Sequence, residues 1–436
     1  MDPENGTLIR RIIGDILRIS GAVGLAHILA LAASPLIARL YSPEAFGQFA
    51  MFNALVTMLT PLTSLRYEWA LPLPREEASA LDLLALCIVL VAISSLALAI
   101  INPFLWPMLA KWIGVSGTEI MLLPVAIFAM GLHAVVTNWL VRERAFREVA
   151  RVRFMTMVGA VACQIGIGCL FAGPRSLILG MIAGYLLGLA LAGYHCRRAL
   201  WRSAARMDLN GMRGTAAEYR SFALITAPSG AVNALGSQMS SMVLPSLYGL
   251  AVNGQYSLAR RVLAQPMVLI GQTVNEVLWG NAARLFAEDP ARLWPLFLQL
   301  NICLLAVMAP SLVLMFFGTE IFAFVFGERW EQAGSFAGIM IAASFLGLAA
   351  QGTTSLHIYR LNHWMSLWEV LQLLLIVVAL VAAWRMALSP VVCIVGITAA
   401  QAASHATLLG LNALAVRRVL RKSEPPQRPT AAARAP

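Results

Sequence analysis

The chain has 436 residues, of which 59% are hydrophobic and only 12% are charged, and its formal net charge is +11 at neutral pH. Soluble domains contain about 25% charged residues, so this composition excludes an ordinary soluble enzyme or nucleic-acid-binding domain. It indicates a protein that crosses a membrane many times. The first apolar segment runs on from Ile19 without a polar cleavage region, so we expect no removable signal peptide.

Apolar segments of about 20 residues, the length of helix that crosses a bilayer, follow one another along the chain, and all except 252–277 are free of charged residues. The first half contains 19–38, 45–65, 83–110, 120–141, 154–173 and 176–194. The second half contains 221–248, 252–277, 293–318, 332–356, 370–384 and 386–416. We therefore predict an all-α polytopic membrane protein with about twelve transmembrane helices, six in each half.

The distribution of basic residues predicts the orientation. Most of them fall in loops that share one side of the membrane, and the positive-inside rule makes that side cytoplasmic, together with both chain ends. The predicted parts are an N-terminal six-helix lobe at 1–196, a basic cytoplasmic linker at 197–220, a C-terminal six-helix lobe at 221–416 and a disordered basic cytoplasmic tail at 417–436. The positive charge then marks topology and anionic lipid, and no nucleic acid is expected as a partner.

One stretch of the first half recurs in the second half. Residues 40–49 contain Leu-Tyr, five residues and Gly-Gln-Phe, and residues 247–256 contain Leu-Tyr, five residues and Gly-Gln-Tyr, at a constant offset of 207. Each copy lies between long apolar segments, which indicates a duplicated membrane unit. Two related halves that handle a substrate between them are the plan of many transporters.

Motifs of soluble enzymes are absent from the sequence. It has no Gly-x4-Gly-Lys-Ser/Thr loop for ATP, no HExxH and no GxSxG, so no catalytic residue is assigned. The six cysteines are scattered without ligand spacing, which predicts neither a metal site nor disulfides, and no cofactor is expected. A membrane glycosyltransferase or polymerase remains an alternative, disfavoured because the outer loops at 111–119 and 319–331 are short.

Two adjacent arginines, Arg260 and Arg261, are the leading candidates for substrate binding. They follow a charge-free run from Ser221 to Ala259, so they lie well inside the eighth span. An arginine near the centre of a membrane helix costs roughly 2.5–3.5 kcal/mol unless it meets water or an anion. Either they line a central cavity that binds a phosphate or carboxylate, or they extend to the outer headgroups or pair with a carboxylate.

Four further charged residues are candidates for binding or gating. Arg66 and Glu68 close the second span, where they form a gate pair or mark the interface. Arg39 lies in the outer turn, as a substrate contact or an interface anchor. Glu276 lies at the inner end of the eighth span and is a candidate gate or ion-coupling carboxylate, for a proton or sodium gradient.

The remaining ionisable groups within the spans have simpler predicted roles. Glu369, near the inner end of the eleventh span, is expected to be a solvated or paired terminus. His27, His133 and His405 could relay protons near neutral pH, but packing with satisfied hydrogen bonds is the preferred interpretation.

Four motifs, in order along the chain, resemble those of bacterial oligosaccharide-lipid flippases of the polysaccharide transporter family. Residues 38–47, ARLYSPEAFG, resemble the turn between the first two helices of that family, and residues 65–68, LRYE, resemble the end of its second helix. Residues 256–262, YSLARRV, resemble its eighth-helix motif, and residues 326–334, FGERWEQAG, the motif before its tenth helix. Each motif alone is weak, but the set is specific.

This resemblance implies the fold shared with multidrug exporters and lipid II flippases, in which two six-helix lobes surround a central cavity and alternate their opening. It implies that undecaprenyl-diphosphate-linked oligosaccharide moves from the inner to the outer leaflet of the bacterial inner membrane, with polymerase and chain-length proteins as possible partners. The arginine of the family's eighth-helix motif corresponds to Arg261, and Arg260 occupies a variable position. Lipid II flippases usually have fourteen helices, so twelve favour O-antigen or exopolysaccharide repeat units. The alternative within this fold is a drug/cation antiporter.

Overall fold

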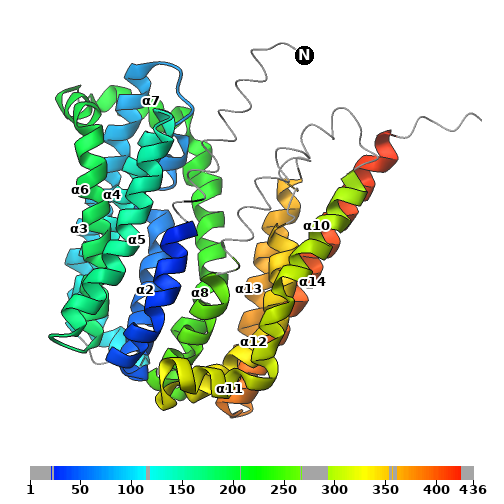
Figure 1. The fold of residues 1–436 in the computed structure, drawn as a ribbon. Coiled ribbons are helices and arrows are strands. Elements are labelled where there is room, and N and C mark those ends of the chain that lie inside the picture. The colour runs from blue at the N-terminus through cyan, green and yellow to red at the C-terminus, as the bar shows by residue number, and fades with distance from the viewer. Residues whose placement is uncertain are drawn as a thin grey trace, which may run out of the picture.

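The computed structural model describes residues 21, 24–113, 118–206, 208–265, 267, 293–352, 356 and 361–423. These residues are helical nearly throughout, and no strand occurs among them. Figure 1 shows two groups of long helices that meet at one end and diverge toward the other. The all-α prediction and the arrangement in two lobes are confirmed.

The first lobe begins with the helix Gly24–Leu40. It continues with α2 (Pro43–Thr63), α3 (Glu77–Ile113), α4 (Leu123–Arg142), α5 (Phe146–Gly168) and α6 (Pro174–Arg206). Short 3-10 helices lie at Tyr67–Ala70 and Thr118–Leu122. The predicted linker is largely helical, because α6 extends to Arg206 and α7 (Leu209–Glu218) follows it.

The second lobe begins with a π-helical turn, Phe222–Thr226, that leads into α8 (Ala227–Tyr248). The helix at residues 250–265 follows after Gly249. The rest of this lobe consists of α10 (Leu293–Met308), α11 (Val313–Phe326), α12 (Glu331–Gly352), α13 (Asn362–Arg385) and α14 (Pro390–Ser423), with 3-10 turns at Ala309–Leu312 and Glu328–Trp330.

Among the described residues, nine helices are long and apolar enough to cross a membrane, and two shorter apolar helices, Gly24–Leu40 and Leu293–Ala306, accompany them. Many large apolar side chains on the outside of the bundle are exposed, among them Leu96, Phe104 and Val378. Such faces suit lipid hydrocarbon, where helices satisfy their own backbone groups. The chain is therefore a multi-pass membrane protein.

The two copies of the sequence repeat make equivalent contacts, each within its own half. The hydroxyl of Tyr41 donates a hydrogen bond to the carbonyl of Gln164 at 2.5 Å, and that of Tyr248 donates to the carbonyl of Leu388 at 2.9 Å. Each tyrosine lies where the helix before the repeat turn ends, and it bonds to a later segment of the same half, Gln164 on α5 or Leu388 in the loop between α13 and α14. The two halves thus repeat a structural contact as well as a sequence motif.

The repeat also joins the two lobes by a reciprocal contact. A Cβ atom added to Gly47 would lie 1.9 Å from the carbonyl oxygen of Leu250, and one added to Gly254 would lie 1.8 Å from that of Pro43. Pro43 and Leu250 are themselves separated by the repeat offset, so the contact has approximate two-fold symmetry. Only glycine lets the two helix starts approach this closely.

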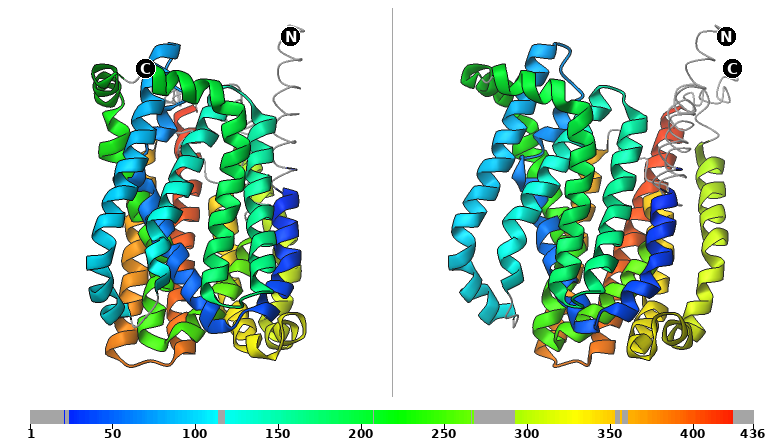
Figure 2. Two further views of the ribbon diagram at one scale, coloured as in Figure 1. Left: turned by 90° about the vertical axis from the view of Figure 1, so that its left-hand side faces the viewer. Right: turned by 60° about the vertical axis from the view of Figure 1, so that its left-hand side comes forward.

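A layer of contacts closes the end of the molecule at which the lobes meet, and we call it the seal. The buried indole of Trp330 donates a hydrogen bond to the carbonyl of Ala38 at 2.8 Å. Arg39 donates from Nη2 to the carbonyls of Phe324 and Val325, at 3.3 and 3.4 Å. The helix α11 lies across this same end (Figures 1 and 2).

Two predicted boundaries are wrong. The span expected at 293–318 is two helices, because Pro310 lacks an N–H and interrupts the helix at the 3-10 turn Ala309–Leu312. The tail expected to be disordered from residue 417 is helical up to Ser423, because α14 extends from Pro390 to that residue.

Candidate functional site

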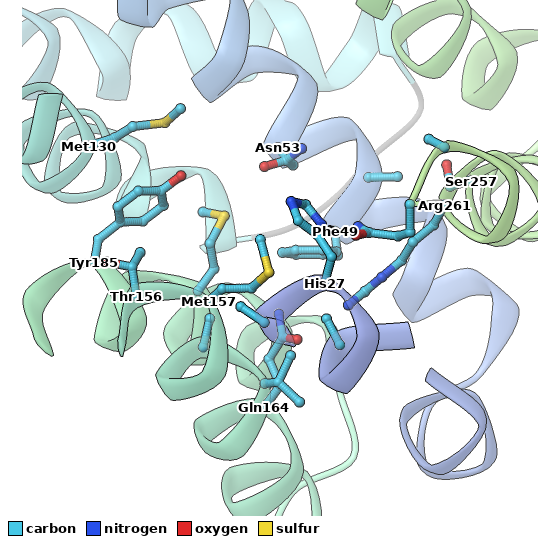
Figure 3. A pocket seen from close by; sticks show the side chains of 18 of the residues that line it. His27, Phe49, Asn53, Met130, Thr156, Met157, Gln164, Tyr185, Ser257 and Arg261 are labelled. Carbon is cyan, nitrogen blue, oxygen red and sulfur yellow. Dashed lines mark hydrogen bonds between the residues drawn. The ribbon is translucent and has the colours of Figure 1, made fainter. Parts of the chain in front are cut away.

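A cavity of about 680 Å³ lies between the two lobes and is lined by side chains of seven helices. From the first lobe come the helix Gly24–Leu40, α2, α4, α5 and α6; from the second come α8 and the helix at residues 250–265. Figure 3 shows side chains from several of these helices converging on this space. The volume is in the range of cavities that hold small organic ligands.

Arg260 and Arg261 both line this cavity. Arg260 donates from Nη1 to Oε1 of Gln238 on α8 at 3.4 Å, and the Arg261 side chain extends into the cavity (Figure 3). Beside them, His27 and Gln265 are in contact through Nδ1 and Oε1. We call Arg260 and Arg261 the cationic wall.

Within the described part of the chain, the charged residues that line the cavity are all arginines, namely Arg153, Arg260 and Arg261. No aspartate or glutamate of the described residues belongs to the lining. Because interactions between charges strengthen as water is excluded, this arrangement favours an anion and disfavours a cation.

Arg153 is the cavity residue that sequence reasoning missed, since it was counted among the basic residues of the cytoplasmic loops. The helix α5 begins at Phe146, which places Arg153 two turns inside it. Arg153, Thr156, Ala160 and Gln164 recur at helical spacing and all line the cavity. That spacing, combined with an earlier helix start, is the signal that could have identified it.

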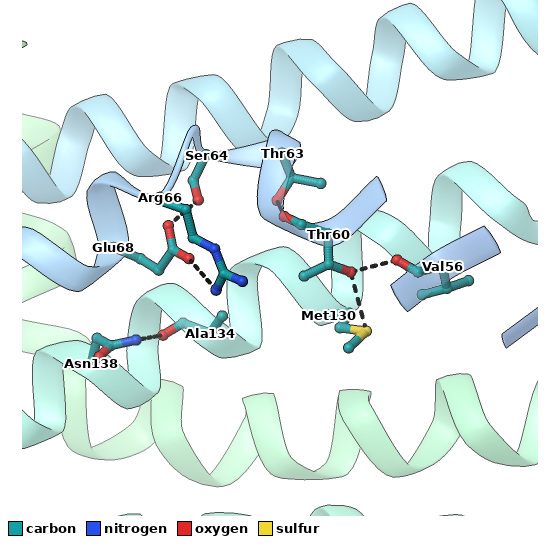
Figure 4. Close-up of polar contacts among 9 residues, drawn as sticks. All are labelled: Val56, Thr60, Thr63, Ser64, Arg66, Glu68, Met130, Ala134 and Asn138. Carbon is teal, nitrogen blue, oxygen red and sulfur yellow. Dashed lines mark hydrogen bonds and ion pairs between the residues drawn. The ribbon is translucent and has the colours of Figure 1, made fainter. Parts of the chain in front are cut away.

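Arg66 and Glu68 lie close together outside the cavity lining. Arg66 Nη1 is 3.7 Å from Glu68 Oε1, the guanidinium lies 4.5 Å from the centre of the Trp69 ring, and the Ser64 hydroxyl donates to Glu68 (Figure 4). A Cβ on Gly230 would lie 3.0 Å from Arg66, so Arg66 packs against α8 of the other lobe. The predicted pair thus exists as an ion pair at the lobe interface, while its role as a gate stays a prediction.

Two of the remaining candidates, Arg39 and Glu369, do not belong to the cavity lining. Arg39 lies in the seal, bound to backbone carbonyls. Glu276 lies outside the described residues. Glu369 accepts hydrogen bonds from Ser229 at 2.9 Å and Asn233 at 3.3 Å, both on α8, which confirms the expectation of a paired carboxylate.

The three histidines of the spans all have polar contacts, as expected for satisfied packing. His27 contacts Gln265, His133 Nε2 lies 2.9 Å from Thr156 Oγ1, and His405 Nδ1 lies 3.2 Å from the carbonyl of Ala343. Within the described residues, no three His, Cys, Asp or Glu side chains gather to hold a metal ion.

Solved structures of two transporters have the same fold. Lipid II flippase MurJ in an inward closed conformation matches with a TM-score of 0.69 and 16% identity, over 92% of this chain and 90% of its own. An inward-facing multidrug MATE transporter of the MOP superfamily matches with a TM-score of 0.63 and 13% identity, over 93% of this chain and 96% of its own. The chain has the helical transporter fold that these proteins share, as the sequence motifs implied.

The sequence comparisons assign the family. The model of a family described as polysaccharide biosynthesis protein matches residues 36–335, and the chain belongs to this family. The amylovoran biosynthesis protein AmsL of Erwinia amylovora is 25% identical over 225 residues, which cover 49% of this chain. The match spans only 54% of that relative's length.

Proposed function

We propose that this protein is a flippase that carries undecaprenyl-diphosphate-linked oligosaccharide repeat units across the bacterial inner membrane for the synthesis of O-antigen, capsule or exopolysaccharide. The observation that carries this proposal is a cavity between two lobes whose charged lining residues, among those that the structure describes, are all arginines. A diphosphate is the anionic part of such a substrate, and arginine binds phosphate oxygens through pairs of donors.

The proposed mechanism is alternating access. The diphosphate binds at the cationic wall and screens Arg261 and Arg260, while the lipid tail stays in the bilayer. The lobes then close on one side of the cavity and open on the other. The transporter returns empty or loaded with a coupling ion, so that the substrate gradient or a proton or sodium gradient drives the cycle.

Membership of the polysaccharide biosynthesis family supports this substrate class, and the transporter fold supports transport without bond chemistry. In the proposed orientation both chain ends are cytoplasmic, and the seal faces the periplasm. The polymerase and chain-length proteins of polysaccharide assembly would act on the product.

A drug/cation antiporter is the alternative within the same fold. Its cargo is a cation, which needs carboxylates in the cavity, whereas the described lining has none. An export assay with a cationic dye therefore separates the two functions: a flippase of this kind leaves dye accumulation unchanged when it is overexpressed.

The decisive experiment measures exported polysaccharide in a deletion strain of the source bacterium that expresses Arg261→Ala. Loss of a charged hydrogen-bonding partner costs about 1.5–3 kcal/mol, so we expect export to fall at least about tenfold with protein level unchanged. Arg385→Ala, which removes an exposed arginine over Trp384 at the end of α13, is the matched control. Normal export by a stably expressed Arg261→Ala variant would overturn the proposal.

A further inference from the structure

The cavity has a second wall whose chemistry differs from the cationic wall. It consists of His133 on α4, Arg153 and Thr156 on α5, and Tyr185 on α6, and we call it the α4–α6 wall. All four residues belong to the first lobe, whereas Arg260 and Arg261 belong to the second. Any ligand that fills the cavity therefore meets both walls.

The hydrogen bonds of the α4–α6 wall determine what it offers to a ligand. The Thr156 hydroxyl donates to the carbonyl of Val152 at 2.9 Å and also lies 2.9 Å from Nε2 of His133. A hydroxyl has one proton, so both contacts are hydrogen bonds only when His133 Nε2 donates. The Nδ1 atom of a neutral His133 is then a free acceptor.

Tyr185 adds an aromatic surface and a hydroxyl. Its ring packs edge-on against the imidazole of His133, with the ring centres 5.3 Å apart and an interplanar angle of 80°. Its hydroxyl has no hydrogen-bond partner among the described residues, and in Figure 3 it lies on the cavity side of the ring, with Asn53 across the space. A tyrosine hydroxyl both donates and accepts.

The two walls therefore suit different chemical groups. The cationic wall presents only donors, and diphosphate oxygens only accept. The α4–α6 wall combines an imidazole acceptor, an amphoteric tyrosine hydroxyl, the donors of Arg153 and an aromatic face. Sugar hydroxyls both donate and accept, and sugar rings carry apolar C–H faces that pack against aromatic rings.

The sequence repeat supports the same division independently. At the offset of 207, the position of Arg260 corresponds to Asn53, and both residues line the cavity. The equivalent positions of the two halves thus carry a cation on one side and a neutral amide, which donates and accepts, on the other.

We propose that the α4–α6 wall is a glycan subsite: it binds the sugars next to the diphosphate through His133, Arg153 and Tyr185, while the diphosphate lies on the cationic wall. This inference rests on the proposed function and extends it, because it fixes the orientation of the substrate across the cavity. Selection among repeat units then depends on the first lobe, and anchoring of the common diphosphate depends on the second.

The test compares two probes on purified protein in lipid nanodiscs: farnesyl diphosphate, and farnesyl diphosphate linked to a disaccharide through its terminal phosphate. Tyr185→Phe removes the hydroxyl, and His133→Gln replaces the imidazole acceptor by an amide of different shape. We expect each to weaken binding of the glycosylated probe about threefold to tenfold with farnesyl diphosphate unaffected. Arg261→Gln weakens binding of both probes. Tyr194→Phe and His363→Gln, on exposed faces outside the cavity, are matched controls.

The outcomes separate the two proposals. If Arg261→Gln weakens both probes while Tyr185→Phe and His133→Gln bind the glycosylated probe as the wild type does, the glycan subsite is refuted and the flippase proposal stands. If Arg261→Gln leaves both probes unaffected, the diphosphate site itself fails, and the glycan subsite fails with it. A monodisperse elution profile verifies that each variant is folded.

Discussion

At the scale of single residues, Arg66 and Glu68 show how a short motif produces an unusual local structure. Leu65 and Arg66 both have positive φ values, 51° and 61°, a conformation that non-glycine residues adopt at some energetic cost. It reverses the chain after α2 and buries Glu68, which is only 2% exposed. Burial raises the pKa of Glu68, and the hydrogen bond from Ser64 and the nearby Arg66 only partly oppose this rise.

This raised pKa predicts a pH dependence of stability. A carboxyl that holds its proton more tightly in the folded protein contributes most to stability at low pH, and that contribution is lost as the pH rises through the raised pKa. Glu68→Gln lacks this group, so its melting temperature should increase relative to the wild type as the pH is raised from 4.5, the ordinary value. Thermal melts in detergent over a pH series provide the measurement. The control is Glu76→Gln, at an exposed neighbouring position, whose melting temperature should keep a constant difference from that of the wild type at every pH. If the melting temperature of Glu68→Gln also keeps a constant difference from the wild type, the expectation is contradicted.

At this scale, charged residues within apolar segments were predicted correctly from the sequence. Arg260 and Arg261 were identified because an arginine within an apolar run needs a partner, and both line the cavity. Arg153 was missed because it follows a run of basic residues, Arg142 to Arg151, that looks like a loop. The contact between His133 and Tyr185 depends on how α4 and α6 pack, which a single sequence does not reveal.

At the scale of the elements, α2 and the helix at residues 250–265 bring the two lobes into close backbone contact. Gly254→Ala would place a methyl group 1.8 Å from the carbonyl oxygen of Pro43. Overpacking of this kind typically costs about 1–3 kcal/mol, here at one of the contacts between the lobes. We expect the seal to loosen, so that a cysteine at Val325, half-buried in the wild type, reacts faster with a water-soluble maleimide.

The matched control for this substitution is Gly193→Ala in α6. No atom lies within 4 Å of the Cβ that it adds, and alanine is the better helix former by about 1 kcal/mol. The control should therefore leave the reaction rate at Val325→Cys unchanged while the protein keeps or gains thermal stability. Equal rates in both backgrounds would mean that the glycine contact does not hold the seal.

The elements themselves were predictable because membrane spans are long and apolar. All twelve predicted segments contain helix in the described residues. The boundaries were less accurate: α3 begins at Glu77 and α5 at Phe146, each several residues before the charge-free run, because a helix continues beyond the hydrocarbon into the headgroup region. The ninth segment is predicted as one span, whereas the turn at Pro310 separates α10 from α11.

At the scale of the whole molecule, transport by alternating access requires the seal to open. Cysteines at positions 39 and 325, whose wild-type residues are joined by a hydrogen bond, can be bridged in a background without the six native cysteines. A short bis-methanethiosulfonate forms a disulfide with each thiol and releases two methanesulfinate ions. We expect the bridge to abolish glycan export and reduction of its disulfides to restore it. A bridge between Arg151→Cys and Glu148→Cys within α5 is the control and should leave export unaffected. Export by the bridged seal would show that this end stays closed during transport.

The lobes were predictable from the duplication, but the position of the seal was not. The motifs at 38–47 and 326–334 were found separately, and nothing in the sequence joins them. In the structure, Trp330 of the second motif bonds to Ala38 of the first. The two motifs meet because the lobes are closed at the seal. Tertiary packing determines that conformation.

The reciprocal contact of Gly47 and Gly254 has a consequence for ancestry. It is the contact that a self-complementary homodimer forms about its axis, so a half-length chain with the motif of residues 40–49 would pair with itself in the same way. Such a pair has two identical sides and no means to tell one end of a ligand from the other. Once both copies share one chain, each side accumulates its own substitutions, as at Asn53 and Arg260. The fusion is what permits a symmetric scaffold to hold a molecule with two unlike ends.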